Sequence, residues 1–277
     1  MQTSLAQMVA LTCYGNAAIH GARAVGFPPS HSTCRFCELI HFTAAPKFVD
    51  SVSPVEMFAD NPDTWMDHVH RRGIVGLRLH QHAQNKPGIS DRNASAFVGG
   101  GRLWRIEALR ANETSEFWHS RWEIGNQQAA DHRIWQVTYT LDEVSPTAPF
   151  PLHALDALAG DLRAALQGIR AFAAANDCTN FVRCFDDALR ALDDPHADVG
   201  EHKDLFPPGT LAPVAQALLR AAQPAWVFGG MGSWNDLSFE GQAQMDYEWV
   251  SNRLFNLLND AIEAAATSSV PTTPRFA

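Results

Sequence analysis

Basic blocks and long apolar runs are both missing from this sequence. Arg71-Arg72 is its densest basic stretch, and the formal net charge is −9 with a pI near 5.7. A surface of that sign repels phosphate backbones, so we expect no nucleic-acid partner. No apolar run reaches the roughly 20 residues that span a bilayer. No Lys or Arg precedes Arg23, as a secretory signal would require. We therefore expect no membrane partner and a cytoplasmic location.

Cysteine is also scarce. The chain of 277 residues contains five cysteines, an odd and sparse count that does not indicate a disulfide framework. Cys34 and Cys37 have the C-x-x-C spacing of zinc knuckles and redox pairs. Cys178 and Cys184 do not repeat that spacing. We therefore interpret the pair at 34 and 37 as buried or structural thiols in a reducing compartment.

Several common catalytic motifs are absent. The sequence has no phosphate-binding G-x-x-x-x-G-K-[ST], no dinucleotide-binding G-x-G-x-x-G and no G-x-S-x-G, S-x-x-K or H-E-x-x-H. Two glycine clusters, at 99–101 and 229–232, match none of these patterns. We interpret them as bulges or as places where the backbone approaches another segment closely.

What is present predicts a folded α+β protein. The chain is 46% hydrophobic and 18% charged, which is enough apolar material for a sizeable core. Residues 1–265 are predicted to form a single domain, sheet-rich over 1–148 and helix-rich over 152–265. Residues 266–277 have the composition of a flexible tail.

Strand patterns dominate the first half. Three strand-length segments joined by short turn-forming links predict an antiparallel meander over about 102–144. Alternating apolar residues predict a further strand over 74–82. Apolar spacing also predicts a helix within the first 25 residues, a strand around 36–42 and a short helix beginning near Asp60.

Helix patterns dominate the second half, where leucines recur at intervals of three and four from residue 155 onward. Strands followed by helices are typical of α+β folds. We therefore expect a mostly antiparallel sheet with the C-terminal helical half packed on one face. The last long helix could instead pair with its copy in a homodimer.

Alternation along the meander sorts its side chains into two faces. One face is aromatic and is expected to point toward the helices. The other face is polar and carries Arg105, Glu107, His119, Arg121, Glu123, Gln136 and Thr138. One interpretation is a solvated face with weak cross-strand ion pairs. The other is a pocket, roofed by the N-terminal segment and the loop 83–101, in which acid and base catalysis becomes possible.

Histidines next to this face suggest a metal. His80 and His82 stand at i and i+2 on the predicted strand, so both imidazoles could reach one ion at about 2.1 Å. Candidates for a third ligand are His68, His70, His119, Glu123 and His132. The pattern predicts a divalent metal such as Zn, Fe, Mn or Ni, and the alternative is a set of surface or packing imidazoles.

An aromatic, glycine-rich segment follows the third predicted helix of this half. Trp226, Phe228 and Trp234 surround the glycines of loop 226–236. They could form a ligand wall or a protein-partner interface. The alternative is a core segment that crosses close to another backbone.

Two functions therefore remain open. The first is a small-molecule enzyme, which could be metal-assisted, with the metal on His80 and His82. His119 would be a further ligand or base, Glu107 or Glu123 the acid/base, and Arg105 or Arg121 the group that binds an anionic substrate. The second is a non-catalytic accessory, sensor or immunity-type protein that binds a ligand or protein through loop 226–236. An enzyme predicts that Glu107 and the histidines lie in a concave site, whereas a binding protein predicts that they are solvated and that Trp234 is exposed.

Overall fold

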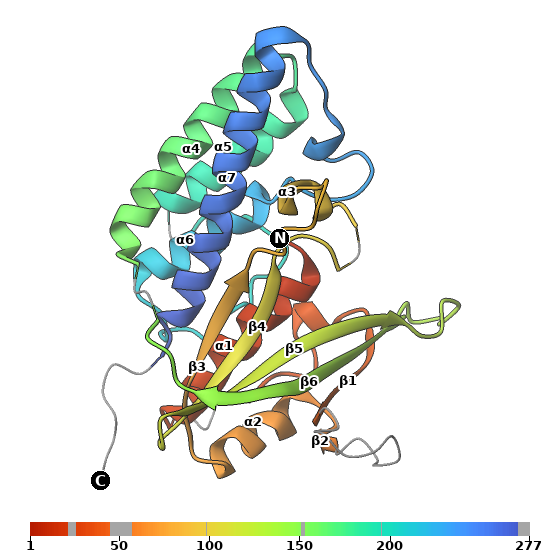
Figure 1. Ribbon diagram of the computed structural model, residues 1–277, viewed down its shortest axis with the longest axis vertical. Coiled ribbons are helices and arrows are strands. Elements are labelled where there is room, and N and C mark those ends of the chain that lie inside the picture. The colour runs from red at the N-terminus through yellow and green to blue at the C-terminus, as the bar shows by residue number, and fades with distance from the viewer. Residues whose placement is uncertain (22–25, 45–56, 98, 151–152, 195, 271–277) are drawn as a thin grey trace.

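A computed structural model describes residues 1–21, 26–44, 57–97, 99–150, 153–194 and 196–270, and these form an α+β fold. Figure 1 shows a helical lobe above a twisted sheet, with the N-terminus at their junction. The strands are β1 (Cys37–Ala44), β2 (Met57–Ala59), β3 (Ile74–His82), β4 (Leu103–Arg110), β5 (Thr114–Ile124) and β6 (Trp135–Pro146). The α-helices are α1 (Thr3–Ile19), α2 (Pro62–Arg71), α3 (Asp91–Ala94), α4 (Leu155–Ala175), α5 (Thr179–Asp193), α6 (Pro213–Ala225) and α7 (Gly241–Thr267). Two short 3-10 helices, η1 (Ser32–Cys34) and η2 (Trp234–Asp236), complete the described elements.

The six strands form one sheet in the order β2-β1-β6-β5-β4-β3. The predicted meander is confirmed as β4, β5 and β6, each antiparallel to the next. The sheet is mixed, however, because β1 runs parallel to β6. Parallel neighbours need a long crossover connection. Here β2, α2, β3, β4 and β5 all lie between β1 and β6 in the chain, and the meander pattern alone could not predict that insertion.

The apolar face of the sheet is covered mainly by α1 and α2, which corrects the expectation that the C-terminal helices would cover it. Helix α1 packs on β3 and β4, whereas α4, α5, α6 and α7 pack chiefly on one another. Helix α1 is buried along most of its length, as expected of a helix that is apolar on nearly every side. Figure 1 shows the C-terminal helices extending beyond the sheet, with the end of α7 reaching down beside β3.

The outer edge of β3 is closed by side chains instead of by another strand. Asn16 of α1 donates to Leu77 O at 2.8 Å and accepts from Leu77 N–H at 2.7 Å. Thr267 of α7 is hydrogen-bonded to both N–H and C=O of Leu79, at 3.0 and 3.2 Å. Glu263 accepts the next free N–H, that of Gln81, at 2.8 Å. These contacts satisfy the edge as a neighbouring strand would, and they fix α1 and α7 against the sheet.

The end of α7 belongs to this packed structure. Thr267 and Ser269 are buried, and Asn16 donates to Ser269 Oγ at 2.7 Å. The segment predicted as a flexible tail therefore includes packed residues up to Ser269, and residues 271–277 lie outside the described part. None of the described helices is long and apolar enough to cross a membrane.

Candidate functional site

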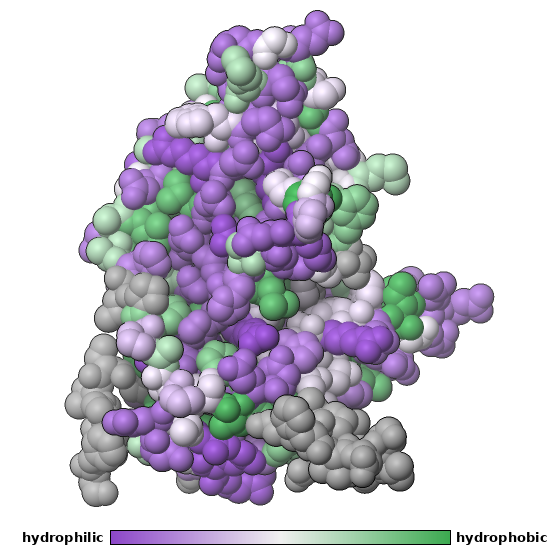
Figure 2. Space-filling model, viewed as in Figure 1, coloured by the Kyte–Doolittle hydropathy of each residue, from purple (hydrophilic) through white to green (hydrophobic). Residues whose placement is uncertain are grey.

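A cleft of about 740 Å³ opens where the helical lobe meets the sheet. Its walls come from the first turn of α1, the segment before β4, the ends of β4, β5 and β6, and the loop after α6. In Figure 2 the surface is indented on the right, between the helical lobe and the projecting β5–β6 hairpin. The volume lies within the range of pockets that bind small molecules.

Three tryptophans form the sheet wall of the cleft. Trp104, Trp122 and Trp135 lie on three adjacent strands and are only half-buried. The rings of Trp122 and Trp135 meet edge to face at 6.0 Å. Alternation had placed all three on the inward face, where they pack against the core while lining the cleft beside the first turn of α1. A strand pattern cannot predict where a covering helix begins.

The mouth of the cleft is also apolar. Phe36, Phe97 and Leu103 line it and are exposed, Phe97 to 66% of its surface. Exposed aromatic groups around a concave surface are typical of a binding site and unusual elsewhere on a soluble protein.

Bare backbone forms the opposite wall. A Cβ atom on Gly100 would lie 1.8 Å from Ala94 O, so no other residue fits there without a shift. Gly101 has a φ of +89°, in the left-handed region that favours glycine. Gly229 and Gly230 face the same cleft. The interpretation of the first glycine cluster as a close backbone approach is confirmed at Gly100.

The polar rim of the cleft is rich in hydrogen-bond donors. Gln2 precedes α1 but makes no capping bond, and its Nε2 instead donates to Ser95 O at 3.0 Å. Gln84 Nε2 donates to Gly101 O at 2.7 Å. Arg102 follows, with Nη2 donating to Asn256 Oδ1 at 2.9 Å. None of the described residues lining the cleft is an Asp or a Glu.

Cys37 lines the cleft, and Cys34 lies close to it. Gln7 Nε2 lies 3.7 and 3.8 Å from their sulfur atoms, and Tyr139 OH donates to Gln7 Oε1 at 2.9 Å. Both thiols are free and buried. Burial raises the pKa of Cys37 to about 12 and also raises the pKa of Cys34. They therefore remain protonated and weakly nucleophilic, as expected for structural thiols.

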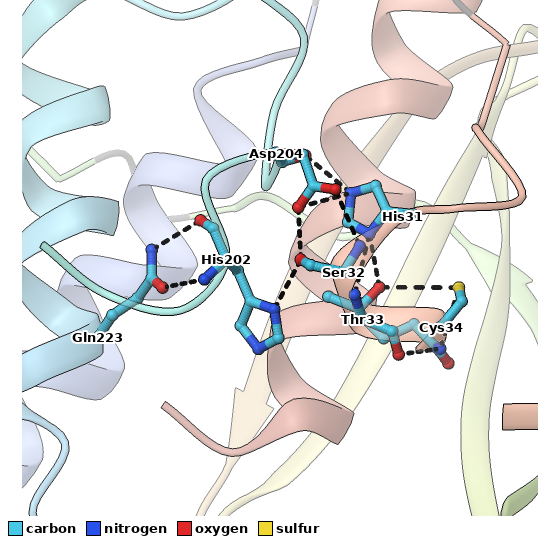
Figure 3. A network of polar contacts seen from close by, with 8 residues as sticks. His31, Ser32, Thr33, Cys34, His202, Asp204 and Gln223 are labelled. Atoms are coloured by element: carbon cyan, nitrogen blue, oxygen red, sulfur yellow. Dashed lines mark hydrogen bonds and ion pairs between the residues drawn. The ribbon is translucent and has the colours of Figure 1, made fainter. Parts of the chain in front are cut away.

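A polar network joins the segment after α1 to the helical lobe (Figure 3). Thr33 N–H donates to His31 Nδ1 at 3.2 Å, so Nδ1 is unprotonated and Nε2–H donates to Asp204 O at 2.7 Å. Ser32 Oγ donates to the Asp204 carboxylate, and His202 Nδ1–H donates to Ser32 Oγ at 2.8 Å. Burial lowers the pKa of both histidines. Sequence analysis missed this network because its two parts lie about 170 residues apart, and neither part shows a motif.

The hydrogen-bond directions exclude a Ser-His-Asp triad here. In a triad the serine gives its proton to the imidazole, which the carboxylate orients. Ser32 instead gives its proton to Asp204 and accepts one from His202. The network is a joint between the two lobes, and Thr33 carries it to the wall of the cleft.

On the polar face of the sheet, the structure brings together two of the predicted residues, His80 and Glu107. His80 Nε2 donates to Glu107 Oε2 at 2.6 Å, and Ser115 Oγ donates to Oε1 at 2.6 Å. Glu107 is only 1% exposed. Burial by itself raises its pKa, but the bonds from His80 and Ser115 and the charge of Arg78 outweigh burial and hold the pKa below its ordinary value. The ring of Phe150 packs edge-on against His80, with centroids 4.8 Å apart.

Arg105 and His119, two of the other predicted catalytic residues, share an acidic neighbour. Arg105 donates to Glu143 at 3.1 Å and lies 3.7 Å from Asp142, which is 3.1 Å from His119. Arg121 donates to Glu123 at 2.9 Å in an exposed pair. Glu123 lies six residues along β5 from Phe117, the register partner of Glu107, which is roughly 20 Å. Glu107 and Glu123 therefore do not share one site, whereas His119 and Arg121 both line the cleft.

The predicted metal ligands are close but have no third partner among the described residues. The rings of His80 and His82 lie nearly parallel with centroids 6.2 Å apart. His80 Nε2 is occupied by Glu107. Within the described ranges, no group of three or more His, Cys, Asp or Glu side chains could hold a metal ion. His68, on α2, packs edge-on against Phe58 of β2, with ring centroids 4.7 Å apart.

The aromatic residues of loop 226–236 lie in the core, which corrects the expectation of an exposed Trp234. Trp234 is fully buried and donates from Nε1 to Ser251 Oγ at 2.7 Å. Phe228 is buried against Phe255, with ring centroids 5.4 Å apart, and Trp226 packs on the same ring. The residues of this loop that line the cleft are Gly229 and Gly230.

Comparison with known proteins identifies no relative: no protein-family model, no curated protein and no solved structure matches the chain.

Proposed function

We propose that the protein binds a small, mainly apolar molecule in the cleft between the sheet and the helical lobe. The observation that carries the proposal is the wall of three half-buried tryptophans inside a cleft of about 740 Å³. Aromatic walls with a few polar groups at one end are typical of small-molecule sites.

Without a ligand, the cleft leaves apolar surface exposed to water. Apolar area costs about 25 cal/mol per Å² when it stays in water. Trp104, Trp122 and Trp135 line the cleft and are only half-buried. A ligand that fills the cleft recovers this hydrophobic free energy, and a flat ring can stack on the indoles.

Binding is favoured over catalysis because the cleft offers no carboxylate to orient an imidazole. His119 lines the cleft, but no described Asp or Glu does, Glu107 and His80 lie outside it, and burial raises the pKa of Cys37. A second candidate function, an enzyme at the polar face, rests on one observation: a buried carboxylate orients the His80 imidazole. Carboxylates hold general bases in this way.

A titration with naphthalene-2-carboxamide, followed by tryptophan fluorescence and calorimetry, tests the cleft. We expect saturable binding with one site per chain. Gly230→Leu should weaken binding at least about 10-fold, or about 1.4 kcal/mol. A Cβ atom on Gly230 meets nothing closer than Ala96 O at 3.6 Å, so the new side chain fits the backbone and fills the cleft.

The matched control is Gly160→Leu. Gly160 is an exposed glycine of α4 with no atom within 4 Å of an added Cβ, and it does not line the cleft. This variant should bind like the unaltered protein. Absence of binding, or equal affinity in both leucine variants, would remove the cleft as the site.

A further inference from the structure

We infer that the ligand of this cleft is an anion, with a flat apolar body against Trp104 and a carboxylate-like head group at Arg102. This inference rests on the proposed function and specifies the class of molecule that the site selects.

The cleft differs in charge from the chain as a whole. The protein carries 30 acidic and 21 basic residues. Yet no described residue lining the cleft is acidic, and its charged side chains are Arg102 and Arg121. Arg121 is paired with Glu123 at 2.9 Å, so Arg102 is the guanidinium that an anion entering the cleft would meet. The lining of the cleft therefore lacks the acidic excess of the chain as a whole.

Arg102 is incompletely neutralised. It forms an ion pair with Asp91, but the distance from Nε to Oδ2 is 3.7 Å, beyond hydrogen-bond distance, and the buried Nε has no hydrogen-bond partner. Asp91 Oδ2 already accepts from Gln84 N–H at 3.1 Å. The one side-chain bond that Arg102 makes is to the neutral amide of Asn256. A guanidinium presents five donors in a fork that matches a carboxylate, so this side chain retains the capacity to bind one.

Arg102 stands two residues before Trp104, at the point where β4 begins. Two residues of extended chain span roughly 7 Å. That distance suits a ligand whose head group meets the arginine while its ring stacks on the indole. Gln2 and Ser95, joined by a hydrogen bond of 3.0 Å, place the polar start of α1 on the same rim.

Three ligands with one ring system and different charges test the inference: naphthalene-2-carboxylate, naphthalene-2-carboxamide and naphthalen-2-ylmethylammonium. We expect the carboxylate to bind about 5-fold more tightly than the amide, and the ammonium compound to bind most weakly, as one half-buried ion pair would produce. Raising the salt concentration from 0.05 to about 0.5 M should weaken carboxylate binding and leave amide binding nearly unchanged, because salt screens only the charged pair.

Variants then locate the charge. Arg102→Gln should reduce the preference for carboxylate over amide to about 1-fold, and Arg102→Lys should retain most of it. The control, Arg163→Gln, makes the same charge change at a surface pair with Asp193, away from the cleft. It should preserve the full preference.

The outcomes separate this inference from the proposed function. If the three ligands bind with equal affinity and equal salt dependence, the anion inference is wrong and the cleft still binds small molecules. If none binds, the proposed function fails as well. If Arg102→Gln does not fold, the anion inference is tested by whether salt weakens carboxylate binding, and not amide binding, in the unaltered protein. A preference that survives in a folded Arg102→Gln variant would overturn the role of Arg102.

Discussion

The aromatic face of the sheet is closed at one end and open at the other. At the covered end, Trp118 and Tyr139 of the sheet are fully buried and pack around Phe42 together with Trp65 of α2. On the same face, Trp104 and its neighbours stand half-buried in the cleft. The two ends have the same residue types in the same alternation. Whether a tryptophan belongs to the core or to a site therefore depends on where the covering helix begins.

The largest expected effect is at the closed end. Trp118→Ala should lower the free energy of unfolding by about 3–5 kcal/mol, because the protein cannot collapse around a cavity of that size. Urea denaturation measures the change. Trp249→Ala, at a tryptophan of α7 that is 60% exposed, should change stability by less than about 0.5 kcal/mol. Similar losses in the two variants would contradict the burial described for Trp118.

A similar contrast between covered and uncovered positions holds for two glutamates of the polar face. Glu107→Ala should lower the free energy of unfolding by about 3 kcal/mol. The substitution removes the carboxylate to which the Ser115 hydroxyl and the His80 imidazole are hydrogen-bonded. Glu123→Ala, in an exposed pair with Arg121, should cost less than about 0.5 kcal/mol in the same urea assay. Equal costs would show that Glu107 is not shielded from water.

At the open end, a tryptophan should matter little for stability and much for ligand binding. Trp104→Ala should lower the free energy of unfolding by only about 1 kcal/mol, because water already reaches the indole. It should weaken binding of naphthalene-2-carboxamide about 10-fold through the lost stacking. Calorimetry on Trp104→Ala and Trp118→Ala together gives the comparison. A Trp104 variant that loses stability but retains affinity would assign this residue to the core.

The smallest expected effect concerns pH. Burial lowers the pKa of His31 and His202 below the ordinary 6.5, so the folded protein holds both rings neutral where the unfolded chain takes up protons. Stability from this source is complete above pH 6.5 and falls as the pH drops below it. The lowered pKa of Asp204 adds a loss in the same direction only below about 3.8.

Thermal melting at pH 7.5 and pH 5.5 measures this effect. The melting temperature should be lower at pH 5.5, and the difference should shrink in a His31→Gln/His202→Gln double variant. An unchanged difference in a folded double variant would place the acid sensitivity elsewhere.

Much of the local structure could be predicted from the sequence, but few of the contacts between distant segments could. Alternation identified the meander and the shared face of Glu107 and His80, because strand geometry fixes which side chains point together. It also placed Trp104 with Trp118, but could not say which of the two a helix would cover. The insertion of β1 beside β6 and the joint between Ser32 and Asp204 are contacts between distant segments. No local pattern records contacts of that kind.

The candidate site was predicted in part and misplaced in part. The glycine clusters were correctly singled out, since a close backbone approach leaves a compositional mark. Trp226, Phe228 and Trp234 were assigned to a surface or a core with equal justification, because an aromatic next to glycine suits both. Arg102 received no attention, since a single arginine at the start of a strand is ordinary until its surroundings are known.

The side chains that close the outer edge of β3 are synthesised at very different times. Asn16 lies near the beginning of the chain, and Glu263 and Thr267 lie near the end of α7. During synthesis, β3 therefore emerges almost 200 residues before two of the groups that satisfy it. Until α7 arrives, the edge offers unpaired N–H and C=O groups to any other extended chain. A nascent or C-terminally shortened chain is thus exposed to strand-to-strand aggregation from which docking of the last helix protects the complete fold.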